Sequence, residues 1–226
     1  MRIVNLPIGV RPETEGLRRR RTFILLCQIL VTSAILGLVP GNLPKLATMV
    51  AVWALTFGRI SQAEFVMMAG VNLCFLGMNQ AALARGIFVF NRPDLFGLPI
   101  YEYVMWGFYI LHEIRLLGGP PPRGRPIAVT AAAVLFALPF ATIADPALLL
   151  LASAAILAGC FVLFHDLLDW AYAGYMAAVG ALIEHVGVGT DQWHYPDQPH
   201  AAVPLWFICM WAGIGLFARR LILPLL

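Results

Sequence analysis

Two glutamates stand near the ends of hydrophobic segments, where an ionisable group is costly and therefore indicates chemistry. Glu102 lies in the aromatic stretch Leu98–Trp106, at the start of a long apolar run. An ionised side chain in hydrocarbon costs at least ~2.5 kcal/mol, so such residues face a protein interior and mark function. On an ideal helix, three further residues fall within about 60° of Glu102: Trp106, Tyr109 and Glu113. This stripe could place a proton donor beside aromatic rings.

Two interpretations of Glu102 remain open. In the first, an apolar pocket keeps the carboxyl protonated, and the group acts as a catalytic acid with Tyr101, Trp106 and Tyr109 lining the substrate site. In the second, the carboxylate is structural and is hydrogen-bonded by a neighbouring helix that presents Asn72 or Asn79. We also expect Asn79 to lie at the substrate site.

Glu184 ends another apolar run and leads into a loop that contains Trp193 and Tyr195. The glycines at 187 and 189 let the backbone leave the helix there. One interpretation makes Glu184 a second catalytic carboxylate, with the two aromatic side chains lining a pocket. The other makes it a glutamate that reaches the membrane surface beside a belt of interfacial aromatic residues.

A second group of ionisable residues lies near the opposite ends of the predicted spans: His112, Glu113, His165, Asp166 and Asp169. Imidazole and carboxylate together suit iron, manganese or zinc, so a metal-dependent membrane desaturase or oxygenase is an alternative function. No H-x-x-x-H or E-x-x-H spacing occurs, and adjacent side chains point about 100° apart on a helix. We therefore expect no metal site, and keep Asp169 as a third candidate catalytic residue.

The composition is that of a polytopic membrane protein. The 226 residues are 61% hydrophobic and 12% charged, with a mean hydropathy of +0.82, whereas soluble domains carry about 25% charged residues. The net charge of +3 is concentrated before the first apolar segment and lacks interleaved aromatic residues, so no nucleic-acid partner is expected. Four well-separated cysteines predict free thiols.

The hydropathy pattern predicts an all-α bundle of about eight transmembrane helices, with seven as the alternative count. A basic cytoplasmic tail, residues 1–21, precedes a single transmembrane domain, residues 22–226. With eight spans, twelve Lys and Arg lie on one side and only Lys45, Arg85 and Arg92 on the other, which predicts cytoplasmic termini in a bacterial-type plasma membrane. The spans are 22–39, 44–58, 62–83, 97–117, 126–144, 147–165, 167–188 and 202–222.

A weak internal sequence similarity is consistent with a four-plus-four parallel repeat. The stretches Pro99–Trp106 and Pro204–Trp211 share proline, an aliphatic residue, methionine and tryptophan at the same offsets, and open the fourth and eighth spans. Transporter folds contain such repeats. The alternative is that proline and aromatic residues are simply common where a membrane helix begins.

The stretch Leu98–Tyr103, followed by an aromatic-rich helix, resembles the P-x-E-E motif of the small integral-membrane carotenoid (lycopene) cyclases. The stretch Glu184–Tyr195, together with Val203–Trp206, resembles the related carotenoid hydratase family. The chain departs from the cyclase motif at Tyr101, where that family has its first glutamate. A bacterial membrane terpene cyclase acting on smaller prenylated substrates would fit the motif equally well.

The resemblance implies a reaction without a redox cofactor, on a lipophilic isoprenoid taken from membrane lipid. A carboxylic acid protonates a terminal alkene or an epoxide, the cation cyclises, and a base removes a proton. Glu102 would be the acid and Glu184 the base, and aromatic faces would stabilise the cation. The sequence is compatible with cyclisation or hydration, and with a homo-oligomer or a hetero-oligomer. A non-enzymatic transporter or assembly subunit is a further alternative.

Overall fold

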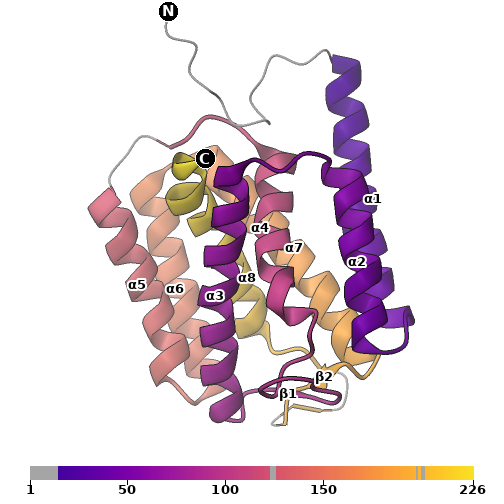
Figure 1. The fold of residues 1–226 in the computed structure, drawn as a ribbon. Helices are drawn as coiled ribbons and strands as arrows, with labels where there is room; N and C mark the ends of the chain where they lie inside the picture. The colour runs from indigo at the N-terminus through magenta and orange to yellow at the C-terminus, as the bar shows by residue number, and fades with distance from the viewer. Residues whose placement is uncertain (1–14, 123–125, 197, 200–201) are drawn as a thin grey trace, which may run out of the picture. The chain divides into compact units, whose positions relative to one another are not determined.

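The computed structural model describes residues 15–122, 126–196, 198–199 and 202–226, and this part of the chain is all-α (Figure 1). The predicted fold class is therefore confirmed. One pair of two-residue strands joins two loops, and the chain ends in a π-helical and a 3₁₀ turn. The elements are α1 Glu15–Leu38, α2 Asn42–Phe57, α3 Gln62–Ala84, β1 Val89–Phe90, α4 Glu102–Leu117, α5 Pro126–Thr142, α6 Pro146–Phe164, α7 Leu167–Gly189, β2 Trp193–His194, α8 Leu205–Phe217, η2 Ala218–Ile222 and η3 Leu223–Leu225.

Local signals explain where several helices begin. Ser61 and Glu64 form a capping box at the start of α3, in which each side chain accepts a backbone N–H hydrogen bond. Asp145 caps α6 by accepting from the N–H of Leu148 at 2.7 Å, and Pro146 occupies the first helical position. The helices break at Pro40-Gly41, between α1 and α2, and at Asp145-Pro146, between α5 and α6, and both sequences are typical of turns.

The first helix begins earlier than its hydropathy predicts. The arginines at 18–21, expected in a tail, form the first turns of α1, and Arg19 pairs with Glu15 one turn away at 2.5 Å. Arginine is a good helix former, and an i,i+4 pair adds a few tenths of a kcal/mol. The rest of the expected tail, residues 1–14, lies outside the described residues.

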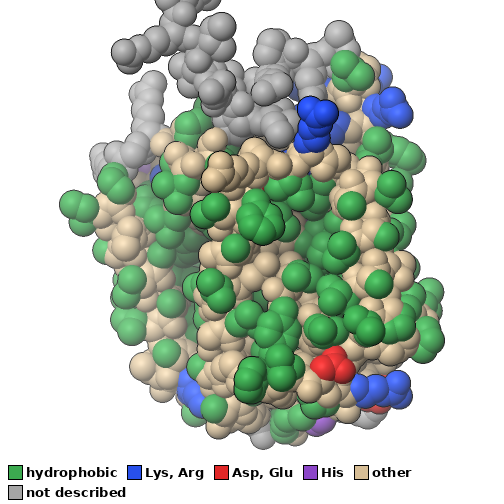
Figure 2. All heavy atoms as spheres, viewed as in Figure 1, with side chains coloured by type: hydrophobic (Ala, Val, Ile, Leu, Met, Phe, Trp, Pro, Cys, Tyr) green, Lys and Arg blue, Asp and Glu red, His purple; other side chains and the backbone are tan. Residues whose placement is uncertain are grey.

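Among the described residues, four helices are long and apolar enough to cross a membrane: Glu15–Leu38, Gln62–Ala84, Pro146–Phe164 and Leu205–Leu225. The predicted count of about eight is not confirmed. Helices α2 and α4 have 16 residues and α5 has 17, which at 1.5 Å per residue is roughly 24–26 Å against a hydrocarbon core of about 30 Å. Figure 2 shows apolar side chains over much of the visible surface, as expected where lipid is the solvent.

The described helices form two compact units that interleave in the sequence. Unit 1 comprises Glu113–Ala181 and Pro204–Leu226, and unit 2 comprises Glu13–His112 and Leu182–Val203. In unit 1, α5, α6, α7 and α8 share a core that includes Phe136, Leu157 and Leu216. In unit 2, α1 and α2 pack side by side, and Trp53 of α2 stacks on Phe108 of α4 with ring centroids 4.0 Å apart.

Two glycines allow close approach between helices, one in each unit. In unit 1, a Cβ on Gly180 of α7 would lie 2.1 Å from Cγ of the buried Trp211 and 2.6 Å from its Cβ. In unit 2, a Cβ on Gly107 of α4 would lie 2.7 Å from the carbonyl oxygen of Met68 in α3. The amide of Gly107 instead donates to Asn72 Oδ1 at 2.7 Å, so glycine permits a polar contact between α3 and α4.

We expect Gly180→Ala to destabilise unit 1 by about 1–3 kcal/mol, the usual cost of overpacking a core. The Trp211 ring cannot swing aside, because its own Cβ is among the atoms that would collide. The matched control is Gly174→Ala in the same helix, where nothing lies within 4 Å of an added Cβ and alanine should be neutral or stabilising. Thermal unfolding of the purified protein in detergent measures both; equal midpoints for the two variants would contradict this packing.

Candidate functional site

Glu102 is the first residue of α4 and is placed by the tight turn that precedes the helix. Gly97 adopts a left-handed conformation (φ +78°) in this turn, which favours glycine. The turn closes through the amide of Leu98, which donates to the carbonyl of Leu95, and Asp94 accepts from the amide of Ile100 at 2.8 Å. The Glu102 side chain, 7% exposed, therefore enters the interior of unit 2 at the start of the helix.

Glu184 of α7 is 3% exposed and is fixed by two aromatic donors. Trp193 Nε1 donates to Glu184 Oε2 at 3.0 Å, and the Tyr195 hydroxyl donates to the same oxygen at 2.7 Å. Burial and the adjacent Glu184 charge raise the pKa of the Tyr195 hydroxyl well above its usual value, which keeps it a donor. Both side chains predicted to accompany Glu184 thus contact it directly.

Gly187, three residues after Glu184, explains how an indole can reach this carboxyl. A Cβ at position 187 would lie 2.0 Å from Cη2 of Trp193, so any larger residue would displace the ring. The flat face of α7 at this glycine lets Trp193 lie against the helix. From the sequence, Gly187 was assigned only to helix termination. Its spacing from Glu184, nearly one helical turn, was the signal that could have placed both residues on the same face of the helix.

A short antiparallel β-ladder positions the segment that carries Trp193 and Tyr195. Strands β1 and β2 pair Val89 with His194 and Phe90 with Trp193. The Phe90 and Trp193 rings meet edge to face, with centroids 5.7 Å apart. No alternating pattern of residue types predicts these strands, because two residues per strand are too few to produce one.

The two carboxyl groups lie close enough for their charges to interact. Asn79 Nδ2 of α3 donates to Glu102 Oε2 at 3.3 Å, and Trp106 contacts the same carboxyl. Within the described part of the chain, Glu102 forms no ion pair with a lysine or arginine. Unit 2 thus holds an acid pair in which Glu102 has no cationic partner.

Aromatic side chains lie around this pair, and most are buried, whereas Phe75 is half-buried. Trp106 stacks on Phe75 of α3 at 4.0 Å and meets Tyr109 edge to face at 6.0 Å. Tyr101 is fully buried, and its hydroxyl has no hydrogen-bond partner among the described residues. Eight of the nine candidate site residues therefore belong to unit 2: Asn79, Tyr101, Glu102, Trp106, Tyr109, Glu184, Trp193 and Tyr195.

Asp169, the ninth candidate, belongs to unit 1 and is held by two arginines. Arg219 Nη1 donates to Asp169 Oδ1, and Arg220 donates to Oδ2 through Nε at 2.8 Å and through Nη2. Arg219 also pairs with Asp166 at 2.7 Å. The π-helical turn η2 turns the adjacent arginines inward, although hydropathy placed them at the membrane surface. Both oxygens of the Asp169 carboxylate are therefore committed to ion pairs within unit 1.

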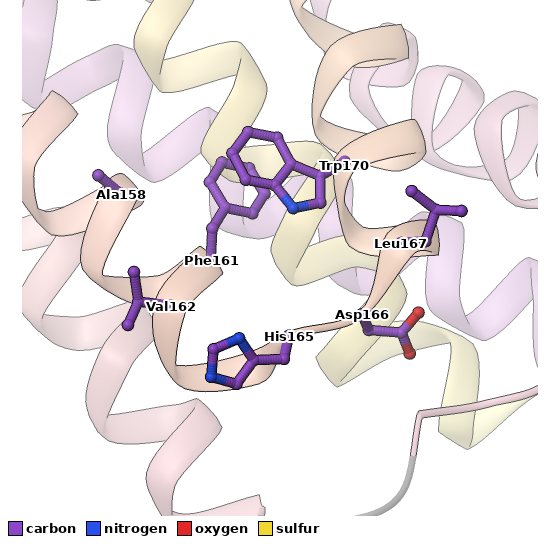
Figure 3. A pocket seen from close by; sticks show the side chains of 7 residues that line it. All are labelled: Ala158, Phe161, Val162, His165, Asp166, Leu167 and Trp170. Atoms are coloured by element: carbon purple, nitrogen blue, oxygen red, sulfur yellow. The ribbon is translucent and has the colours of Figure 1, made fainter.

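The turn between α6 and α7 contains an open, mainly apolar hollow of about 530 Å³ in unit 1 (Figure 3). Trp170 stacks on Phe161 along its wall, with centroids 3.7 Å apart. His165 and Asp166 lie at its edge, but the Asp166 carboxylate is already bound by Arg219. The hollow therefore offers no free acid–base pair. Its lining residues are Ala158, Phe161, Val162, His165, Asp166, Leu167 and Trp170.

The residues considered for a metal site have other surroundings. His112 Nδ1 lies 2.7 Å from Gln28 Oε1 of α1, in unit 2, and Glu113 is fully buried in unit 1. Among the described residues, no three His, Cys, Asp or Glu side chains group as metal ligands. The four cysteines are free thiols, as predicted.

Comparison of the chain with protein-family models, with curated proteins and with solved structures finds no match. The case for function therefore rests on the geometry of unit 2 and on the resemblance of its motifs.

The ion pair of Asp166 predicts a pH-dependent contribution to stability. Burial opposes ionisation of this carboxyl, but donors from Arg219 and the Leu168 amide and the charges of both arginines outweigh it and lower the pKa of Asp166. A lowered folded-state pKa stabilises the protein above the unfolded value of about 3.9 and is lost as the pH falls through the folded value. The stability deficit of Asp166→Asn should therefore be present at pH 7 and vanish toward pH 2.

Thermal unfolding of the native chain and the variant between pH 7 and pH 2 measures this deficit. The matched control is Asp145→Asn, because asparagine caps a helix about as well as aspartate does. A deficit for Asp166→Asn that persists at the lowest pH would rule out the ion pair as its source.

Proposed function

We propose that this chain is an integral-membrane isoprenoid or carotenoid cyclase, in which Glu102 protonates a terminal alkene or an epoxide. The observation that carries the proposal is the acid pair of unit 2, in which Glu102 and Glu184 are both buried, are close enough for their charges to interact and have aromatic side chains nearby. Two buried carboxyls without a cation between them are most stable when they share one proton. An acid that stays protonated in an apolar site is what alkene protonation requires.

The hydrogen bonds of the two carboxyls support a different role for each. Glu184 receives two strong donors on one oxygen, from Trp193 and Tyr195, and donors of this kind stabilise the ionised form. Glu102 receives a long amide contact from Asn79 at 3.3 Å and a contact from Trp106, and we propose that these stabilise its ionised form less than the two donors on Glu184 do. The shared proton therefore resides on Glu102, which is the acid, and Glu184 is the base.

The reaction is redox-neutral. The O–H bond of Glu102 breaks as a C–H bond forms at the terminal alkene carbon, which leaves a tertiary cation. The electron pair of an internal alkene closes the ring, and Glu184 takes a proton from the carbon next to the new cation, whose C–H electrons form the final double bond. The product is an isomer of the substrate, and the proton returns to Glu102 before the next turnover.

The aromatic rings supply the rest of the chemistry. A cation over an aromatic face is stabilised by about 0.5–2 kcal/mol per ring, and Trp106 and Tyr109 lie beside the acid. Exclusion of water prevents capture of the cation as an alcohol. The cyclase motif that this chain resembles has a glutamate where Tyr101 stands, and we propose that Glu184 supplies the second carboxyl from α7.

Glu102→Gln should lower turnover by at least about 10²–10⁴-fold, because the amide cannot donate the proton, while the unfolding midpoint changes little. Glu184→Gln should also lose turnover. Arg85→Ala, which changes an exposed residue at the end of α3, is the matched control and should retain activity. Mass spectrometry of lipids incubated with each protein gives the readout.

A product of unchanged mass indicates cyclisation, and a gain of one water indicates hydration by the same acid. A loss of two hydrogens would instead indicate desaturation. Full activity in Glu102→Gln would remove Glu102 as the acid and would sink the proposal.

We further propose eight spans with both termini in the cytoplasm of a bacterial-type plasma membrane and a four-plus-four repeat. The shorter helices support this count, because they expose apolar side chains: Leu55 of α2 is 85% exposed and Ile127 of α5 is 86% exposed. Charge asymmetry supports the orientation.

Topology reporters fused after Pro122 and after Leu226 should both be active in the cytoplasm. A reporter inserted at Arg92 should be active on the opposite side. Opposite locations for the Pro122 and Leu226 fusions would exclude the eight-span count.

A further inference from the structure

Unit 2 contains a buried cation without an anionic partner. Lys45, in the first turn of α2, is 4% exposed. Its ammonium donates to Gln192 Oε1 and lies 5.7 Å from the centroid of the Tyr101 ring. No described carboxylate pairs with it. A buried ammonium group is costly unless a negative charge compensates it.

A second cation lies beside the first. The side chain of Asn42 donates to the carbonyl of Arg92 at 2.6 Å and to Asp94 Oδ2 at 2.8 Å, which ties this loop to the start of α2. The exposed Arg92 side chain is close enough for its charge to act on Lys45. The Asp94 carboxylate accepts from Asn42 and the Ile100 amide, and it forms no ion pair with either cation in the described structure.

The start of α2 adds positive potential at the same place. Gly41 precedes the helix and provides no side-chain cap. Unpaired amides and the helix dipole make such a terminus favourable for an anion. Together with the buried Lys45 and the exposed Arg92, this terminus forms a cationic site at the boundary between interior and surface.

The cationic site adjoins the acid pair through Tyr101. The Tyr101 ring lies beneath the Lys45 ammonium in a cation–π arrangement, and Tyr101 immediately precedes Glu102. Its buried hydroxyl has no partner among the described residues, and an unsatisfied buried hydroxyl is costly until a polar group meets it. A ligand with an anionic end and an apolar chain would satisfy both features.

We infer that Lys45 and Arg92 bind the phosphate or diphosphate head group of the isoprenoid that the acid pair cyclises. The inference rests on the proposed function and narrows its substrate class from neutral hydrocarbons to prenyl lipids with an anionic head. The head group undergoes no bond change. Because Tyr101 adjoins Glu102, a bound chain must fold back so that its terminal alkene reaches the acid.

The test compares geranylgeranyl diphosphate with geranylgeraniol, which has the same chain without the charge. Full-length protein in phosphatidylcholine nanodiscs is titrated with each, and binding is followed by tryptophan fluorescence, with calorimetry as a second readout. The diphosphate should bind at least ~10-fold more tightly, equivalent to about 1.4 kcal/mol. Lys45→Gln and Arg92→Gln should each reduce this preference.

Arg85→Gln is the matched control, because Arg85 is an exposed cation of the same unit and should leave the preference unchanged. Arg92 is exposed, so its variant tests the inference even if Lys45→Gln fails to fold. Equal binding of diphosphate and alcohol by the native protein, or an unchanged preference in Arg92→Gln, would overturn the inference. Equal displacement of the bound prenyl diphosphate by phosphatidylglycerol at the same concentration would also overturn it, because the site would then bind lipid anions in general.

The head-group inference and the proposed cyclase activity can be contradicted independently of each other. Loss of the head-group preference, with Glu102-dependent cyclisation of a neutral carotene intact, would overturn this inference and leave the cyclase standing. A diphosphate preference that persists in Glu102→Gln, while the native protein produces no cyclised or hydrated lipid, would support the cationic site and contradict the cyclase.

Discussion

Repulsion between two carboxyl groups in an apolar interior is the constraint on which unit 2 depends. Two negative charges that interact in an apolar interior, away from water, are unstable without compensation. The chain compensates one of them with donors, since the Trp193 indole and the Tyr195 hydroxyl both point at Glu184. Gly187 leaves room for the Trp193 ring against α7, and the two-residue ladder holds the segment that carries both donors. The fold of this region can be understood as support for one unequal pair of acids.

Sequence reasoning could find the members of this pair because each carries a local signal. A glutamate inside an aromatic, apolar segment is conspicuous, and so is a glutamate followed by glycines, tryptophan and tyrosine. The contacts that join the two segments carried no such signal. The pairing of Phe90 with Trp193 spans about a hundred residues and involves two residues per strand. Neither periodicity nor propensity registers a ladder that short.

Asp169 shows the opposite case, in which a local signal was misleading. Its position inside an apolar helix resembles that of Glu102, so both were candidates for catalysis. The difference lies in Arg219 and Arg220, which hydropathy placed at the membrane surface because charged residues after an apolar segment usually lie there. The π-helical turn turns them inward instead. Local unwinding of this kind depends on tertiary packing, so a pattern of residue types does not predict it.

The interleaving of the two units affects how the protein is made. Unit 2 takes α1 to α3 and most of α4 from the first half of the chain, then the C-terminal part of α7 and the loop after it, Leu182–Val203. The bond from Lys45 to Gln192 closes a loop of 147 residues, and the contact between Asn91 and His194 closes one of 103. A ribosome therefore releases Glu102 into the membrane long before Glu184, Trp193 and Tyr195 exist. Its carboxyl must wait in lipid or in the insertion machinery while unit 1 is being synthesised.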